Sequence, residues 1–156
     1  MSLAPFNPTS DDSLKIVLQF MQLSNDDIVV DLGCGDGRFL IQAAKTTPVK
    51  KAIGIEVDPT FYHRATAAVR TSNVQDRIDI VLGDALSFDW SLATHVFLYL
   101  VPNGIQLLLP KLKEARARGV CIVTNMFAIP NWNPTEMTLC RGTKVIIKLR
   151  RIKDGV

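Results

Sequence analysis

Short apolar runs alternate with amphipathic segments along most of this chain. Five runs of strand length are rich in β-branched residues, and they cover residues 28–31, 52–57, 78–82, 94–100 and 120–124. Between several of them, apolar residues recur at helical spacing, over residues 37–46, 59–71 and 105–118. Strands that alternate with helices predict a Rossmann-like α/β fold, with a mostly parallel sheet and helices on both faces.

The two ends of the chain add to this pattern. Residues 4–23 predict an N-terminal extension and a helix, with Thr9 or Ser10 as its cap and an apolar stripe of Leu14, Val17, Leu18 and Met21. Near the other end, two apolar runs flank Arg141-Gly142, which is typical of a hairpin. We therefore expect one antiparallel strand at the sheet edge and a single domain spanning residues 1–156.

A glycine-rich turn follows the first strand. Asp31 ends the apolar run, Gly33, Gly35 and Gly37 follow at alternate positions, and a helix-compatible segment then begins. Glycine permits unusual backbone angles and lets a ligand lie against the main chain, while the helix N-terminus offers unpaired N–H groups. The turn predicts a binding site for an anionic or zwitterionic cofactor.

Acidic residues stand at the ends of three successive predicted strands. Asp31, Glu56 and Asp84 each follow an apolar run. The carboxyl ends of parallel strands share one edge of a sheet, and ligands of such sheets bind beyond that edge. We expect these three carboxylates to surround one site.

Composition and charge narrow the class of protein. Of the 156 residues, 47% are hydrophobic and 21% charged, as in soluble globular domains. No secretory signal or membrane-spanning run is evident, and the spacing of Cys34, Cys121 and Cys140 predicts neither a metal site nor disulfides. Residues 110–156 carry ten basic and three acidic side chains, so this basic third either faces an acidic partner or simply keeps the surface solvated.

Two cofactor classes compete for the glycine turn. A dinucleotide fingerprint requires a third glycine where this chain has Arg38, which argues against a nicotinamide or flavin enzyme. Asp31-x-Gly33-x-Gly35-x-Gly37 instead resembles motif I of the class I, seven-stranded S-adenosylmethionine-dependent methyltransferases. In that family the terminal hairpin supplies strands six and seven.

The resemblance implies specific roles around the cofactor. Glu56 would accept hydrogen bonds from the ribose hydroxyls, and Asp84 would accept one from the adenine amino group. Asp31 would orient the loop or reach the cofactor ammonium through water. The remaining implied contacts to the cofactor come from Gly33, Cys34, Gly35, Gly37, Val57, Ala85 and Leu98.

A narrower resemblance rests on four segments. These are Phe6-Asn7-Pro8-Thr9, Val30 to Arg38, Gly54 to Pro59, and Leu98-Tyr99-Leu100-Val101-Pro102. Together they are similar to the small protein-lysine methyltransferases that act on the ATP synthase c-ring protein or on the adenine nucleotide translocase. The [DNS]-P-P-[YFW] pattern of enzymes that methylate adenine or glutamine amides does not occur after the fourth strand.

The resemblance implies a protein substrate with an acceptor lysine. Lysine must lose its proton before its nitrogen attacks a methyl group, and burial in an apolar slot favours the neutral amine. Tyr99 and Asn103, at the exit of the fourth strand, are the candidates for accepting hydrogen bonds from that amine; packing in the core is the alternative for Tyr99. Trp90 and Trp132 are candidates for walls of the acceptor channel.

Other functions remain open at this stage. The basic C-terminal third keeps a small-molecule or RNA methyltransferase in view, and a catalytically idle cofactor-binding partner protein is a further alternative. The family's eukaryotic enzymes are mitochondrial and carry an N-terminal membrane segment that we do not find in this sequence. We therefore expect an intracellular protein, cytoplasmic or mitochondrial.

Overall fold

A computed structural model describes residues 11–125, 129–132, 136–140 and 144–149. Helices and strands alternate through most of this range, in the order α1 (Asp11–Met21), β1 (Ile28–Leu32), α2 (Arg38–Thr46), β2 (Lys51–Glu56), α3 (Pro59–Thr71), β3 (Ile78–Leu82), β4 (His95–Leu98), α4 (Pro102–Ala117), β5 (Cys121–Asn125), β6 (Glu136–Cys140) and β7 (Lys144–Leu149).

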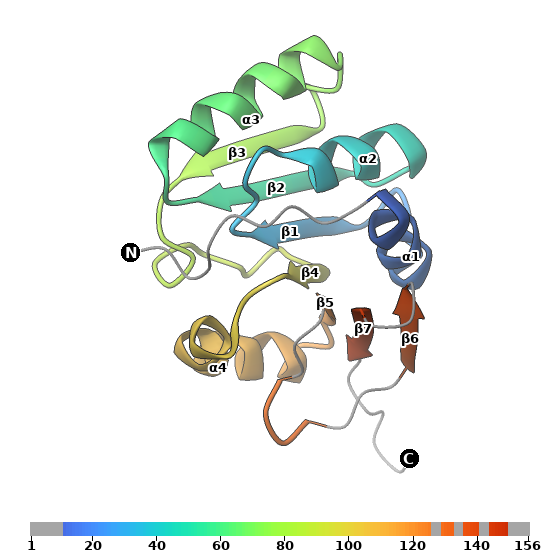
Figure 1. Ribbon diagram of the computed structural model, residues 1–156, viewed down its shortest axis with the longest axis vertical. Coiled ribbons are helices and arrows are strands. Elements are labelled where there is room, and N and C mark those ends of the chain that lie inside the picture. Colours follow the sequence, from blue (N-terminus) through green and yellow to red (C-terminus); the bar gives the residue numbers. More distant parts are fainter. Residues whose placement is uncertain (1–10, 126–128, 133–135, 141–143, 150–156) are drawn as a thin grey trace.

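The strands form one sheet with the order β3-β2-β1-β4-β5-β7-β6 (Figure 1). Strands β1 to β5 are mutually parallel, which confirms the predicted α/β class with a parallel five-stranded sheet. Strand β7 pairs antiparallel with β5 and β6. The predicted turn at Gly142 lies outside the described residues.

The strand order reverses between β1 and β4, whose shared carboxyl edge is the switch point of the sheet. Strand β1 pairs with β2 on one side and with β4 on the other, so Asp31 is in register with Gly54 and with Phe97. Ligands of open α/β sheets bind beyond the carboxyl ends of the strands at such a point.

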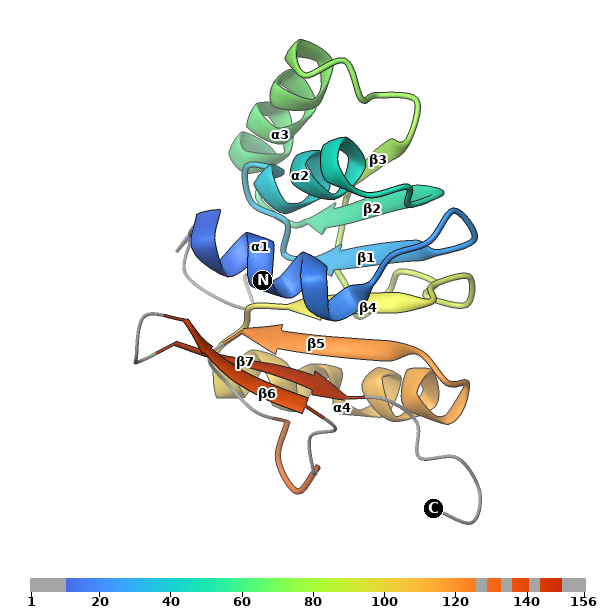
Figure 2. The ribbon, with the colours of Figure 1, turned by 90° about the vertical axis from the view of Figure 1, so that its right-hand side faces the viewer.

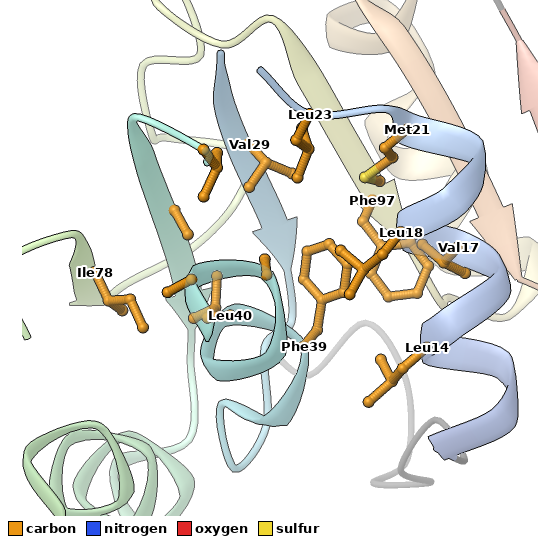
Figure 3. Packing of buried hydrophobic residues seen from close by; sticks show 14 of the residues in the cluster. Leu14, Val17, Leu18, Met21, Leu23, Val29, Phe39, Leu40, Ile78 and Phe97 are labelled. Carbon is orange, nitrogen blue, oxygen red and sulfur yellow. The ribbon is translucent and has the colours of Figure 1, made fainter. Parts of the chain in front are cut away.

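Helices surround the sheet and create a core on each face (Figure 2). Helices α1, α2 and α3 pack on one face, over the cluster that we call the first core, and α4 packs on the other face, over the second core. Side chains alternate accordingly along β4, where Phe97 belongs to the first core and Val96 and Leu98 to the second. Figure 3 shows the first core, in which the rings of Phe39 and Phe97 lie 4.6 Å apart beside the apolar stripe of α1.

Two helices confirm their predictions closely. The buried face of α1 contains the four predicted residues of its apolar stripe, although the proposed caps Thr9 and Ser10 lie outside the described residues. Helix α3 has Pro59 in its first turn, and the side chain of Asp58 accepts a hydrogen bond from the Thr60 N–H at 2.8 Å. An Asp-Pro pair is typical of such a cap at the start of a helix.

The region after β4 differs from the prediction. Strand β4 ends at Leu98, two residues early, and α4 begins at Pro102 instead of at residue 105. The helix begins earlier than expected because proline's fixed φ suits the first turn of a helix, where its missing N–H has no cost. Helix α4 contains Pro110 in its interior and extends to Ala117.

The residues that follow β3 form a single turn. The N–H groups of Ser87 and Phe88 both donate to the carbonyl oxygen of Asp84. None of the helices in the described part of the chain is long and apolar enough to cross a membrane.

Candidate active site

The glycine turn joins β1 to α2 at the switch point. Gly33, Gly35 and Gly37 have φ angles of 75°, 58° and 83°, a region that other residues adopt only with strain. The Gly33 and Cys34 N–H groups donate to the carbonyl oxygen of Ile55 at 2.8 and 3.1 Å, so the turn is fixed against the end of β2. The left-handed conformation explains why glycine recurs at alternate positions.

The carboxylate of Glu56 closes the other side of this turn. Its Oε1 accepts a hydrogen bond from the Gly35 N–H at 2.8 Å, and its Oε2 accepts one from the Asp58 N–H at 2.9 Å. The side chain is buried, with 8% of the residue surface exposed. Because each carboxylate oxygen has two lone-pair sites, Glu56 keeps capacity for further donors while it holds the turn in place.

Asp31 lies buried at the end of β1. Burial, with the nearby charges of Glu56 and Asp36, raises the pKa of Asp31 to about 8. The next acidic group, Asp36, behaves oppositely, because hydrogen bonds from the Arg38 guanidinium lower its pKa. Arg38 holds Asp36 through two contacts, of 2.6 and 3.1 Å, at the start of α2.

The side chain of Cys34 packs into the sheet. A Cβ added to Gly54 would lie 2.7 Å from the Cys34 sulfur and 2.5 Å from the Leu40 side chain. The absence of a side chain at Gly54 therefore lets the turn and α2 approach β2. Burial, together with the charges of Asp31 and Glu56, raises the pKa of the Cys34 thiol, so this thiol stays protonated.

Asp84 stands beside Glu56 at the end of β3. The Gly83 N–H donates to the Glu56 carbonyl oxygen at 2.9 Å, which ties these two strand ends together. The Asp84 Oδ1 accepts a hydrogen bond from the Leu86 N–H at 2.9 Å. Asp84 therefore shapes its own turn at the same edge as the other two carboxylates.

The other predicted site residues differ in how deeply they are buried. Tyr99 is half-buried against the first core, and Asn103 is exposed in the first turn of α4. Leu98 and Ala85 are buried among the residues of the second core, so only their backbone is available to a ligand, while Val57 is half-buried after β2.

The two tryptophans lie against α4. The Trp90 indole N–H donates to the Ala85 carbonyl oxygen at 3.1 Å, and the residue is 4% exposed. The Arg116 guanidinium lies over the Trp132 ring, 4.5 Å from its centroid. Trp90 therefore packs in the second core, and a place for either tryptophan at an acceptor channel stays a prediction.

Sequence reasoning missed three residues at this edge. Gly54 has no local signal apart from a glycine inside a strand, which indicates close backbone approach. Thr124 and Asn125 end β5 with polar side chains, and these residues are 0% and 1% exposed. Two polar residues at the end of an apolar strand are the sequence signal that indicates such a pair.

Comparison with known proteins agrees with this geometry. A model of the ANTKMT methyltransferase domain matches residues 31–136. A protein-lysine N-methyltransferase of Saccharolobus islandicus is 40% identical over 133 residues, which are 85% of this chain and 83% of that protein. The lysine N-methyltransferase of Xenopus laevis that is named for the ATP synthase C protein is 28% identical over 85% of this chain, but the match spans only 58% of that longer protein.

A solved structure has the same fold over nearly its whole length. The RNA methyltransferase of Salinibacter ruber, crystallised with S-adenosyl-L-homocysteine, superposes with a TM-score of 0.88 at 30% identity, and the match covers 95% of both chains. The fold, together with the glycine turn and the three carboxylates at the strand ends, thus defines a class I S-adenosylmethionine-dependent methyltransferase. This chain belongs to the ANTKMT methyltransferase domain family, which confirms the predicted resemblance.

Proposed function

We propose that this methyltransferase transfers the methyl group of S-adenosylmethionine to the side-chain amine of a lysine in a protein substrate. The observation that carries the proposal is the 40% identity to the protein-lysine N-methyltransferase of Saccharolobus islandicus over most of both chains. Matches to lysine N-methyltransferases named for an ATP synthase component and for the adenine nucleotide translocase support the same acceptor chemistry.

The residues of the switch point fit this cofactor. The carboxylate of Glu56 is fixed by two backbone N–H groups and keeps free lone pairs, as a ribose diol requires. The glycines of the turn carry no Cβ, so no side chain of theirs stands between the main chain and the methionine part. Asp31 supplies a buried carboxyl group that orients the loop or reaches the ammonium through water, and Asp84 supplies an acceptor for the adenine amine.

The bound cofactor supplies a methyl group already activated by the sulfonium. The chain's task is therefore to align a neutral amine with that group and to exclude water. Tyr99 follows β4 and Asn103 lies in the first turn of α4, and their oxygens are the candidate acceptors of hydrogen bonds from the amine. The pairing of β6 with β7 and of β7 with β5 supports the finer fold proposal of a seven-stranded methyltransferase sheet completed by an antiparallel hairpin.

An RNA acceptor is the second candidate, since the Salinibacter structure is named for RNA and residues 110–156 are strongly basic. Incubating the purified protein with cell extract and methyl-tritiated S-adenosylmethionine separates the two. We expect tritium label that digestion with protease removes and digestion with nuclease leaves in place. Label that nuclease removes would contradict the proposal. The Glu56→Gln variant, at limiting cofactor, is the matched control and should label far less.

A further inference from the structure

The amide of Asn125 is buried without a hydrogen-bond partner at the carboxyl end of β5. Only 1% of the residue surface is exposed, and within the described structure neither the Nδ2 nor the Oδ1 atom has a partner. Buried amides are nearly always satisfied, because an unpaired one is costly. A bound molecule that supplies a donor and an acceptor would remove this cost.

The sheet places Asn125 on the face that carries Tyr99. Strands β4 and β5 are parallel, with Phe97 in register with Val123 and Leu98 with Thr124. Tyr99 is the residue that follows β4, and Asn125 is the last residue of β5. Because side chains alternate, Asn125 shares the face of Val123, which belongs to the same core as Phe97 and the Tyr99 that packs against it.

From this placement we infer that the Asn125 amide binds the acceptor amine, with its oxygen taking a hydrogen bond from the lysine N–H. The inference rests on the proposed function. An amide oxygen suits this role because it is neutral: it orients an amine without stabilising the ammonium form as a carboxylate would. The Nδ2 donors are left for an oxygen of the incoming substrate.

The transfer that follows balances in electrons and protons. The lysine nitrogen uses its lone pair to form the N–CH3 bond, and the electron pair of the S–CH3 bond stays on sulfur. The methylated nitrogen is then positive, and its extra proton leaves to water. Asn125 neither gains nor loses a proton in this sequence, so its contribution is to orient the lone pair toward the methyl group.

Thr124 provides a matched control. Its hydroxyl is also buried and has no partner among the described residues, but alternation directs it to the opposite face, beside Leu98 in the second core. Replacing either side chain by an apolar residue of similar size removes a buried, unsatisfied polar group. Both replacements should therefore keep or raise the melting temperature, and only the replacement of Asn125 should slow methyl transfer to the acceptor.

The test compares Asn125→Leu and Thr124→Val with the parent protein. Cofactor affinity is measured by titrating S-adenosylhomocysteine, and methyl transfer by tritium incorporation into the acceptor protein found in extract. We expect unchanged cofactor affinity in both variants and a loss of kcat/KM for the acceptor of at least about tenfold in Asn125→Leu alone. Asn125→Ala serves if leucine does not fit, with the same expectation.

Full transfer activity in both Asn125 variants would overturn the inference, as would a weakened affinity for S-adenosylhomocysteine, which would assign the amide to the cofactor. A loss of activity in Thr124→Val as large as in Asn125→Leu would also overturn it. If the parent protein labels lysine and the Asn125 variants do too, only this inference fails. If the parent labels RNA alone, the proposed function fails first.

Discussion

The Glu56 carboxylate accepts a hydrogen bond from the backbone N–H of Gly35, across 2.8 Å and 21 residues of sequence. One side chain at the end of β2 therefore fixes the middle of the turn after β1. Its second oxygen holds the Asp58 N–H at the entry to α3. A residue expected only to contact a ribose also organises the surface on which the cofactor would lie.

Replacing Glu56 by Gln should weaken cofactor binding through both roles. The amide keeps one oxygen acceptor, but its NH2 group faces a backbone N–H that needs an acceptor. We expect a loss of about 1–3 kcal/mol in the affinity for S-adenosylhomocysteine, measured by titration calorimetry. Unchanged affinity would remove Glu56 from the ribose site. Asp79→Asn, at an exposed residue paired with Lys51, is the control and should bind normally.

Gly54→Ala should destabilise the fold. Its Cβ would meet Leu40, the sulfur and the Cβ of Cys34 at 2.5 to 2.9 Å, so packed side chains must shift. We expect a decrease of about 1–3 kcal/mol in the free energy of unfolding, measured by urea denaturation. Gly83→Ala is the matched control, since the nearest atom to its Cβ would be 3.8 Å away. Equal stability of the two variants would refute this account of the close approach.

Asp31→Asn should change how stability depends on pH. The pKa of Asp31 rises from 3.8 to about 8 on folding, so between these values the folded state binds more protons than the unfolded state. Stability of the cofactor-free protein should therefore fall as pH rises through this window. The variant should lose this dependence, and thermal unfolding should show it gaining stability over the parent as pH rises toward 8.

Asp89→Asn serves as the comparison, because Asp89 should contribute a pH dependence of stability of the opposite sign. Hydrogen bonds from Ser91 lower the pKa of Asp89. The stability that this carboxylate contributes is therefore present at neutral pH and is lost as pH falls through the folded pKa. A stability advantage of Asp31→Asn that did not grow with pH would contradict the buried, protonated state of Asp31.

Tyr99→Phe should slow methyl transfer while leaving cofactor affinity near normal. The ring would keep its packing against the first core, and only the hydroxyl would be removed. A fall of about tenfold in kcat at saturating cofactor is the expected result, because one hydrogen bond in the reacting complex is lost. Unchanged turnover would return Tyr99 to a packing role.

Local sequence signals predict the parts of this fold that depend on neighbouring residues. Alternating apolar runs locate the five parallel strands, and the Asp58-Pro59 pair marks the start of α3. The same signals misplace the start of α4, because a proline such as Pro102 suits a break and a first helical turn equally well. The choice between these depends on where the preceding strand ends.

The candidate site is predictable where residue type and strand end coincide. Asp31, Glu56 and Asp84 follow apolar runs, and the topology brings those ends to one edge. The two hydrogen bonds accepted by Glu56 and the close packing over Gly54 involve three-dimensional contacts that no local pattern encodes. Asn125 is marked in the sequence only as a polar residue at a strand end, and its unpaired amide is visible only once burial is known.

The most direct test of this account is a crystal structure of the protein with S-adenosylhomocysteine. We predict ribose hydroxyls within hydrogen-bonding distance of Glu56, with the sulfur facing Tyr99 and Asn125 beyond the ends of β4 and β5. A ligand seated elsewhere would contradict it, for example in the cavity of about 450 Å³ between α1 and α2, which none of the predicted site residues lines.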